Sequence, residues 1–152
     1  MPIKHWDLKP GDRVTTLPLT SPCHNCVNCM EGKYAQCTNK VPGVGNYDSS
    51  PGTYAQLFKT APFLVRKIPD GMKDEEAAMI EPAATPYAVT KDLNIRTGDR
   101  ILISGGGIIG SLAAQWCKYW GAEYVCMTEV NDFRAKKNLA DGYVDEVFDG
   151  RD

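Results

Sequence analysis

Four cysteines crowded into fifteen positions are the residues whose chemistry follows most directly from their spacing. They form the pattern C-x2-C-x2-C-x7-C and are Cys23, Cys26, Cys29 and Cys37. Four thiolates can close a tetrahedral zinc site, and metal binding then supplies folding free energy. The surrounding residues 21–40 hold almost no large apolar side chains, so a core cannot order them. We therefore predict a structural zinc lobe over residues 21–40.

Other interpretations of the cysteines remain open. Two local disulfides fit the count, but the N-terminus has no apolar segment that would direct the chain to an oxidising compartment. An iron–sulfur cluster also uses four thiolates, yet the bacterial ferredoxin pattern has a shorter last gap and a proline where this sequence has Thr38. His24 could replace one cysteine as a ligand. Because four sulfurs already fill a tetrahedron, we expect His24 to lie outside the ligand set.

A glycine-rich turn is the second stretch that could do chemistry. It satisfies GxGxxG between a predicted strand, residues 101–104, and a predicted helix, about residues 109–120. Glycine lets the backbone turn sharply and approach a pyrophosphate, while the helix N-terminus offers N–H groups to the phosphates. The residues predicted to bind the cofactor at this turn are Gly105, Gly107, Ile108, Ile109 and Gly110. A glycine-rich turn without a ligand is the alternative.

Glu129 stands nineteen positions after Gly110, at the end of the next predicted strand. A carboxylate at this place accepts hydrogen bonds from the adenosine ribose and repels a 2′-phosphate, so it favours NAD over NADP. Five residues further on, Arg134 could lie near the adenine, or it could be a solvated helix residue. The alternative for Glu129 is an acid that faces water.

The elements that must position these residues fall into two groups. Short strands are predicted at residues 14–17, 54–59 and 63–68, with an exposed loop over residues 41–52. From Asp74 the sequence is rich in alanine, and Pro82 and Pro86 are expected to split it into two short helices.

A strand–helix–strand unit follows. The second strand is predicted at residues 124–128, and Gly121 stands where a helix-capping glycine belongs. The side chains expected to pack the helix on a sheet, because they recur every three or four positions, are Ile109, Leu112, Ala113, Trp116 and Trp120. Cys117 and Cys126 are expected to be small buried hydrophobic residues.

Composition excludes several classes of partner. The chain has 152 residues, with 17 basic and 19 acidic side chains, a formal charge of −2. No long basic run suits nucleic acid or an anionic membrane, and no apolar stretch is long enough to cross a bilayer. We expect a cytoplasmic protein.

Several motifs in order resemble the zinc-containing medium-chain dehydrogenase/reductase family, in its sorbitol and threonine dehydrogenase branch. They are GDRV, the four cysteines, GTYAQLF, IPDGMKDEEAAMIEP and GDRILISGGGIIG, and they span about Gly11 to Phe148. The resemblance implies an α/β fold: part of a chaperonin-10-like β domain with a structural zinc lobe, residues 1–80, then a helical hinge, residues 81–96. Residues 97–152 would form the first half of a Rossmann doubly wound parallel sheet.

The resemblance also implies a function, the NAD-dependent oxidation of an alcohol or polyol by a zinc enzyme. Glu81 matches the family's glutamate near a catalytic zinc, although by itself it is only an acid early in a helix. The family's cysteine and His-Glu ligands are not found, because His5 is followed by Trp6. We therefore expect an internal fragment that is inactive alone, and a homo-oligomer, a dimer or tetramer, in the full-length form. A non-catalytic dinucleotide-binding module or an assembly module is the alternative.

Overall fold

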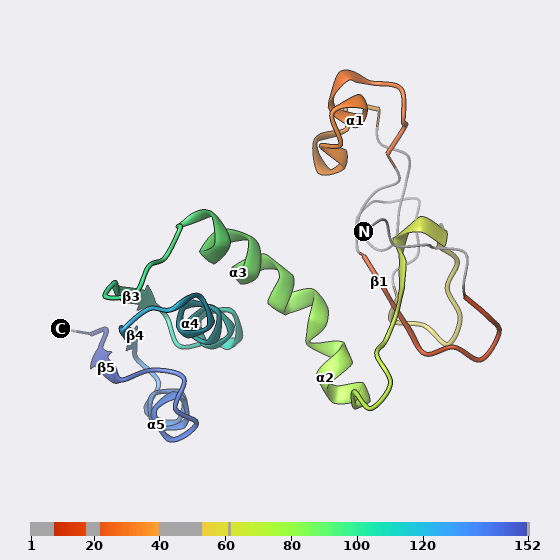
Figure 1. Cartoon of the computed structure of the whole chain (residues 1–152). Coiled ribbons are helices and arrows are strands. Elements are labelled where there is room, and N and C mark those ends of the chain that lie inside the picture. The colour runs from red at the N-terminus through yellow and green to blue at the C-terminus, as the bar shows by residue number, and fades with distance from the viewer. Residues whose placement is uncertain (1–7, 18–21, 40–52, 61, 152) are drawn as a thin grey trace. The chain divides into compact units, whose positions relative to one another are not determined.

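The computed structural model describes residues 8–17, 22–39, 53–60 and 62–151 (Figure 1). The chain divides into two compact units, Met1–Ala78 and Met79–Asp152. The loop predicted at residues 41–52 lies outside the described residues. No helix in the described part of the chain is both long and apolar enough to span a bilayer.

The first unit is built from short elements. They are β1 (Val14–Thr16), α1 (Val27–Met30), two 3-10 helices (Tyr34–Gln36 and Pro62–Leu64), β2 (Val65–Lys67) and α2 (Asp74–Ala78). Strands β1 and β2 pair antiparallel, with Thr15 opposite Arg66. A turn follows β2, where Gly71 has a φ of +86° and Met72 N–H donates to the Pro69 carbonyl.

The strand predicted over residues 54–59 is wrong. Residues 53–60 contain no strand, and the side chains of Tyr54 and Leu57 are exposed. The strand predicted over residues 63–68 shrinks to β2, because a 3-10 turn precedes it. Alternation of apolar and polar residues shows that a segment can form a strand, but a partner strand must also be available.

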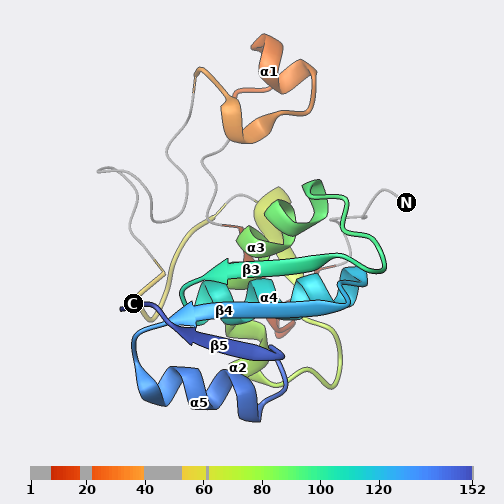
Figure 2. The same cartoon turned by 90° about the vertical axis from the view of Figure 1, so that its left-hand side faces the viewer.

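The second unit is a parallel sheet with helical crossovers. Its elements are α3 (Ile80–Asp92), β3 (Arg100–Ser104), α4 (Ile108–Trp120), β4 (Tyr124–Glu129), α5 (Asp132–Ala140) and β5 (Glu146–Asp149). The strand order is β3-β4-β5, and Figure 2 shows the three strands running in the same direction. Right-handed crossovers in this order place α4 and α5 on the same face of the sheet. The predicted α/β unit after residue 97 is present.

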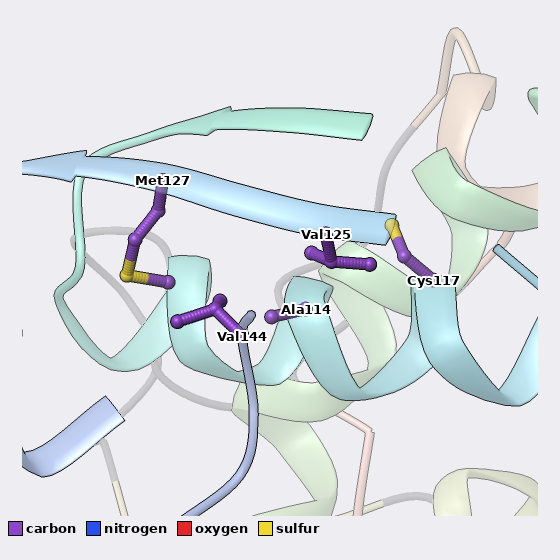
Figure 3. Close-up of a cluster of buried hydrophobic side chains, with 5 residues drawn as sticks. All are labelled: Ala114, Cys117, Val125, Met127 and Val144. Carbon is purple, nitrogen blue, oxygen red and sulfur yellow. The ribbon is translucent and has the colours of Figure 1, made fainter. Parts of the chain in front are cut away.

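The core of this unit lies between α4 and β4 (Figure 3). Val125 and Met127 point from β4 toward Ala114 and Cys117 of α4, and Val144 closes the cluster. Cys117 is thus the buried hydrophobic residue that the sequence predicts. Cys126 lies on the other side of β4, is only partly buried, and donates its thiol hydrogen to the Ile101 carbonyl.

The prediction of which α4 side chains face the sheet is wrong for Ile109, Trp116 and Trp120. Ile109 is 46% exposed, and the two tryptophans turn toward α3. Trp116 Nε1 donates to the Ala83 carbonyl at 3.1 Å, and Trp120 Nε1 donates to Thr90 Oγ1 at 3.1 Å. The smaller Ala114 and Cys117 face the sheet because they let the helix approach it closely.

The segment from Asp74 does form two helices, but neither proline separates them. The break falls at Met79, between α2 and α3. Pro82 occupies the first turn of α3, where the N–H has no intrahelical partner in any case. Pro86 lies inside α3 and removes one backbone hydrogen bond without ending the helix. Helix α3 packs on α4 in the second unit, and the division into residues 1–80, 81–96 and 97–152 stays a prediction.

Candidate functional site

The four cysteine sulfurs converge in the first unit. All four lie within 4.8 Å of one another, and they form the only such metal-capable group among the residues that the structure describes. Cys23 Sγ lies 3.9 Å from Cys29 Sγ, and Cys26 Sγ lies 3.9 Å from Cys37 Sγ. A tetrahedral zinc with bonds of about 2.3 Å separates its sulfur ligands by about 3.8 Å. The spacing therefore fits zinc.

The backbone around the sulfurs is short and local. Cys26 precedes α1 and Cys29 lies within it, so one helical turn carries two of the sulfurs. Cys37 N–H donates to the Tyr34 carbonyl, and Cys23 N–H points at the Cys37 sulfur at 3.4 Å. The apolar side chains of this turn are exposed, which agrees with a lobe that lacks a core.

Disulfides and a histidine ligand, two of the three alternatives, receive no support from the geometry. All six cysteines are free, and a separation of 3.9 Å is far longer than a disulfide bond of about 2.0 Å. His24 is exposed, its backbone is left-handed with a φ of 55°, and its ring meets the Tyr34 ring edge-on at 5.7 Å. It is not part of the group of four sulfurs.

The thiols of the lobe differ in acidity. Backbone hydrogen bonds from Thr38 and Cys29 lower the pKa of Cys26 to about 5, whereas burial and neighbouring thiols raise the pKa of Cys29 to about 12. A bound cation would bring all four to the thiolate form, because a coordinating thiol is deprotonated.

The glycine turn in the second unit has the geometry that its sequence predicts. Gly105 has a φ of +92°, and Gly107 is the N-cap of α4. A Cβ on Gly110 would lie 1.9 Å from the Gly105 carbonyl oxygen, so helix and turn approach too closely for any other residue. A Cβ on Gly107 would meet nothing within 4 Å, which leaves open space beside the helix N-terminus. Ile108 and Ile109 follow at the start of α4 and are exposed.

Glu129 is the buried acid next to this turn. Its Oε2 accepts from Gly106 N–H at 2.9 Å and from Arg134 Nε at 2.9 Å, and its Oε1 accepts from Asn131 N–H at 2.7 Å and from Arg134 Nη2 at 3.0 Å. Arg134, followed by the N–H groups of Asn131 and Gly106, holds the pKa of Glu129 at about 2. The structure thus brings Glu129, Arg134 and the glycine turn together.

Two residues of this site are not among those that the sequence motif predicts. Gly106 is buried, and a Cβ there would meet Glu129 Oε2 at 3.0 Å and Met127 Sδ at 3.0 Å. Asn138, in α5, is 3% exposed, and its Nδ2 donates to the Gly106 carbonyl at 3.1 Å. The middle glycine of the GGG run is a visible signal for Gly106. An asparagine within a helix gives no such signal.

Glu81 lies in the first turn of α3 and is exposed. It belongs to no metal-capable group among the described residues. Its suggested role near a catalytic zinc stays a prediction.

Comparisons with known proteins agree with both halves of this description. Residues 3–70 match the alcohol dehydrogenase GroES-like domain family. L-Threonine 3-dehydrogenase from Yersinia enterocolitica is 40% identical over 126 residues, which make up 82% of this chain and 35% of that protein.

Two solved structures from Escherichia coli share the fold. An oxidoreductase of unknown specificity, described as involved in membrane biogenesis, has a TM-score of 0.82 and 30% identity, over 95% of this chain and 41% of its own. Galactitol-1-phosphate dehydrogenase has a TM-score of 0.79 and 26% identity, over 95% of this chain and 40% of its own. The chain thus spans less than half the length of each protein that it matches here.

Proposed function

We propose that this chain, which belongs to the zinc-containing medium-chain dehydrogenase/reductase family, provides the zinc lobe and half of the dinucleotide site of an alcohol or polyol dehydrogenase. The family consists of enzymes that depend on zinc and NAD(P). The relatives named above act, by their names, on threonine and on a sugar-alcohol phosphate. A small molecule that carries a hydroxyl group is accordingly the proposed substrate class.

The dinucleotide site carries this proposal. The open space beside Gly107 adjoins the N-terminus of α4, whose first N–H groups have no intrahelical partner and can bind phosphate. Glu129 lies next to the same turn, where the adenosine ribose would bind. Its negative charge favours NAD over NADP.

Glu129 is not free to bind ribose without adjustment. The four hydrogen bonds that it accepts fill the four acceptor positions of a carboxylate. Two come from backbone N–H groups, at Gly106 in the turn and at Asn131 just before α5, and two come from Arg134, whose side chain is 49% exposed. The ribose hydroxyls would therefore share Glu129 with Arg134 or take its place, which puts the Arg134 guanidinium next to the adenosine.

The zinc assigned to Cys23, Cys26, Cys29 and Cys37 is structural, because four protein ligands leave no open position for a substrate. A catalytic zinc needs three protein ligands and an open position, and Glu81 is the one residue that we propose for that role. The bound nicotinamide would supply the hydride acceptor. We propose that the 152-residue chain binds the cofactor but does not turn over alone, and that the full-length form is a homo-oligomer.

Titration of the purified chain with NAD tests this function. Saturable binding is expected, and Glu129→Gln should weaken it about tenfold, since hydrogen bonds to a charged group contribute about 1.5–3 kcal/mol. Absence of binding would contradict the dinucleotide assignment. A steady rate of NADH formation with an alcohol, scaling with chain concentration, would contradict the proposed inactivity of the isolated chain.

A zinc-stabilised binding or assembly module is the second candidate. It is favoured by the single metal-capable group in the described part of the chain. Strands β3 and β5 are also the two edges of the described sheet, and an unpaired edge can template association with another strand. Cofactor binding without turnover in a full-length protein would support this candidate over the first.

A further inference from the structure

The Gly106 peptide groups are held from two directions by buried side chains. Glu129 Oε2 accepts the Gly106 N–H at 2.9 Å, and Asn138 Nδ2 donates to the Gly106 carbonyl at 3.1 Å. These two contacts fix the orientation of a glycine whose backbone would otherwise be permissive.

Packing alone does not account for Asn138. Its Nδ2 also donates to the Arg134 carbonyl at 2.8 Å, but its buried Oδ1 has no hydrogen-bond partner in the described structure. Burying an amide oxygen without a partner costs free energy, and a leucine, whose side chain branches at the same atom, would avoid that cost. The donor bond to Gly106 therefore sets Asn138 apart from a packing residue.

The direction of this bond determines where the next N–H points. The Gly106 carbonyl and the Gly107 N–H belong to one planar peptide, and no peptide bond in the described residues is cis. In a trans peptide these two groups point in opposite directions. Because the carbonyl points at buried Asn138, the Gly107 N–H points away from it, and the space beside Gly107 is open.

We propose that Asn138 is a positioning residue of the dinucleotide site, which orients the Gly106–Gly107 peptide so that the Gly107 N–H donates to the pyrophosphate. This inference rests on the proposed function. Ser111 Oγ also donates to the Gly106 carbonyl, at the longer distance of 3.4 Å. Without the shorter bond from Asn138 the peptide between two glycines can flip, and a flipped peptide presents its carbonyl oxygen to the phosphate instead of its N–H. The bound anion would then face the negative end of the peptide dipole.

The test compares Asn138→Leu with the unaltered chain, using ADP-ribose, which carries the pyrophosphate, and adenosine, which does not. Asn138→Leu should bind ADP-ribose about ten- to hundredfold more weakly, as expected for loss of a hydrogen bond to a charged group. Its adenosine affinity should change less than twofold, and its thermal midpoint should stay the same or rise. A purely structural role would lower the midpoint and weaken both ligands together.

Gln115→Leu is the matched control. Gln115 Nε2 donates to the carbonyl four residues earlier, at Ser111, as Asn138 does at Arg134, but Gln115 is exposed on α4. Its loss should leave the affinity for ADP-ribose unchanged. The amide resonance of Gly107 in a ¹⁵N spectrum should shift on Asn138→Leu and stay in place on Gln115→Leu, without any ligand.

The outcomes distinguish failure of the positioning role from failure of the proposed function. If the unaltered chain binds ADP-ribose and Asn138→Leu binds it equally well, the positioning role is overturned and the proposed function stands. If the unaltered chain binds no ADP-ribose, the proposed function fails and the positioning role fails with it. If Asn138→Leu does not fold, Asn138→Ala takes its place, and an unmoved Gly107 resonance in that folded variant overturns the proposal.

Discussion

Arg134 donates two parallel hydrogen bonds to the buried Glu129 carboxylate, from Nε to Oε2 at 2.9 Å and from Nη2 to Oε1 at 3.0 Å. The two residues are five positions apart, at the end of β4 and in the first turns of α5. Asn131, the N-cap of α5, accepts the Arg134 N–H through its own side chain. The pair therefore connects the strand that ends beside the glycine turn to the helix that follows it.

This pair predicts an acid-sensitive stability. The pKa of Glu129 is about 2 in the folded chain, against an ordinary value of 4.5, mainly because of Arg134. A depressed pKa stabilises the fold above the ordinary value, and that contribution is lost as the pH falls from about 4.5 toward 2. Asp149, whose pKa Arg151 also lowers to about 2, acts in the same window.

Glu129→Gln should consequently lose less stability as the pH falls. Urea midpoints measured by circular dichroism from pH 7 to pH 2.5 should fall less steeply for Glu129→Gln than for the unaltered chain. Glu123→Gln, at an exposed acid before β4, serves as the control and should keep the original slope. Equal slopes for all three chains would show that the ion pair does not stabilise the fold.

The stability of the chain should respond differently to alanine at two glycines of the same turn. In a helix, Gly→Ala ordinarily stabilises by about 1 kcal/mol, but Gly110→Ala places a Cβ 1.9 Å from the Gly105 oxygen and should destabilise by about 1–3 kcal/mol. Gly107→Ala meets no atom within 4 Å and has a φ of −71°, so stability should change by less than about 0.5 kcal/mol.

Gly107→Ala should weaken ligand binding instead, because the methyl group would enter the space left for the pyrophosphate. Denaturant unfolding and NAD titration of both variants check the two effects. A destabilised Gly107→Ala, or a Gly110→Ala as stable as the unaltered chain, would contradict the described turn.

The packing of α3 on α4 depends on a buried hydroxyl. Thr90 is 4% exposed, accepts the Trp120 indole N–H, and donates to the Pro86 carbonyl at 2.7 Å. Thr90→Val keeps the shape but leaves the indole N–H without its acceptor, so we expect a loss of about 1–3 kcal/mol. Thr85→Val, at an exposed position of the same helix, should cost less than about 0.5 kcal/mol. Urea unfolding followed by tryptophan fluorescence compares them, and similar costs for the two variants would refute the packing role of Thr90.

Much of the second unit could be predicted from the sequence because its signals are local. The strand before Gly105, the helix after it and the cap at Gly121 each follow from residues next to one another in the chain, and all three are present. The cysteine spacing likewise anticipates that the four sulfurs gather. Local signals were sufficient wherever one short segment fixes its own geometry.

The errors concern contacts between segments. The residue pattern of 54–59 is that of a strand, but it cannot show whether another strand pairs with this segment, and in the described structure none does. Periodicity likewise could not show whether Trp116 faces the sheet or α3. Asn138 becomes part of the site only because α5 folds back beside the glycine turn, thirty-two residues away in sequence from Gly106. Proline rules also placed the helix break too late, because Pro82 fits the first turn of a new helix.

The zinc content of the purified chain tests the central claim most directly. Elemental analysis should find about one zinc per chain, and Cys29→Ser should lose it, while Cys126→Ser should keep it, because Cys126 lies in β4 outside the group of four sulfurs. That result would confirm a structural zinc lobe without a complete catalytic site. A chain without zinc would contradict the metal assignment, and two zinc ions per chain would contradict the incomplete catalytic site.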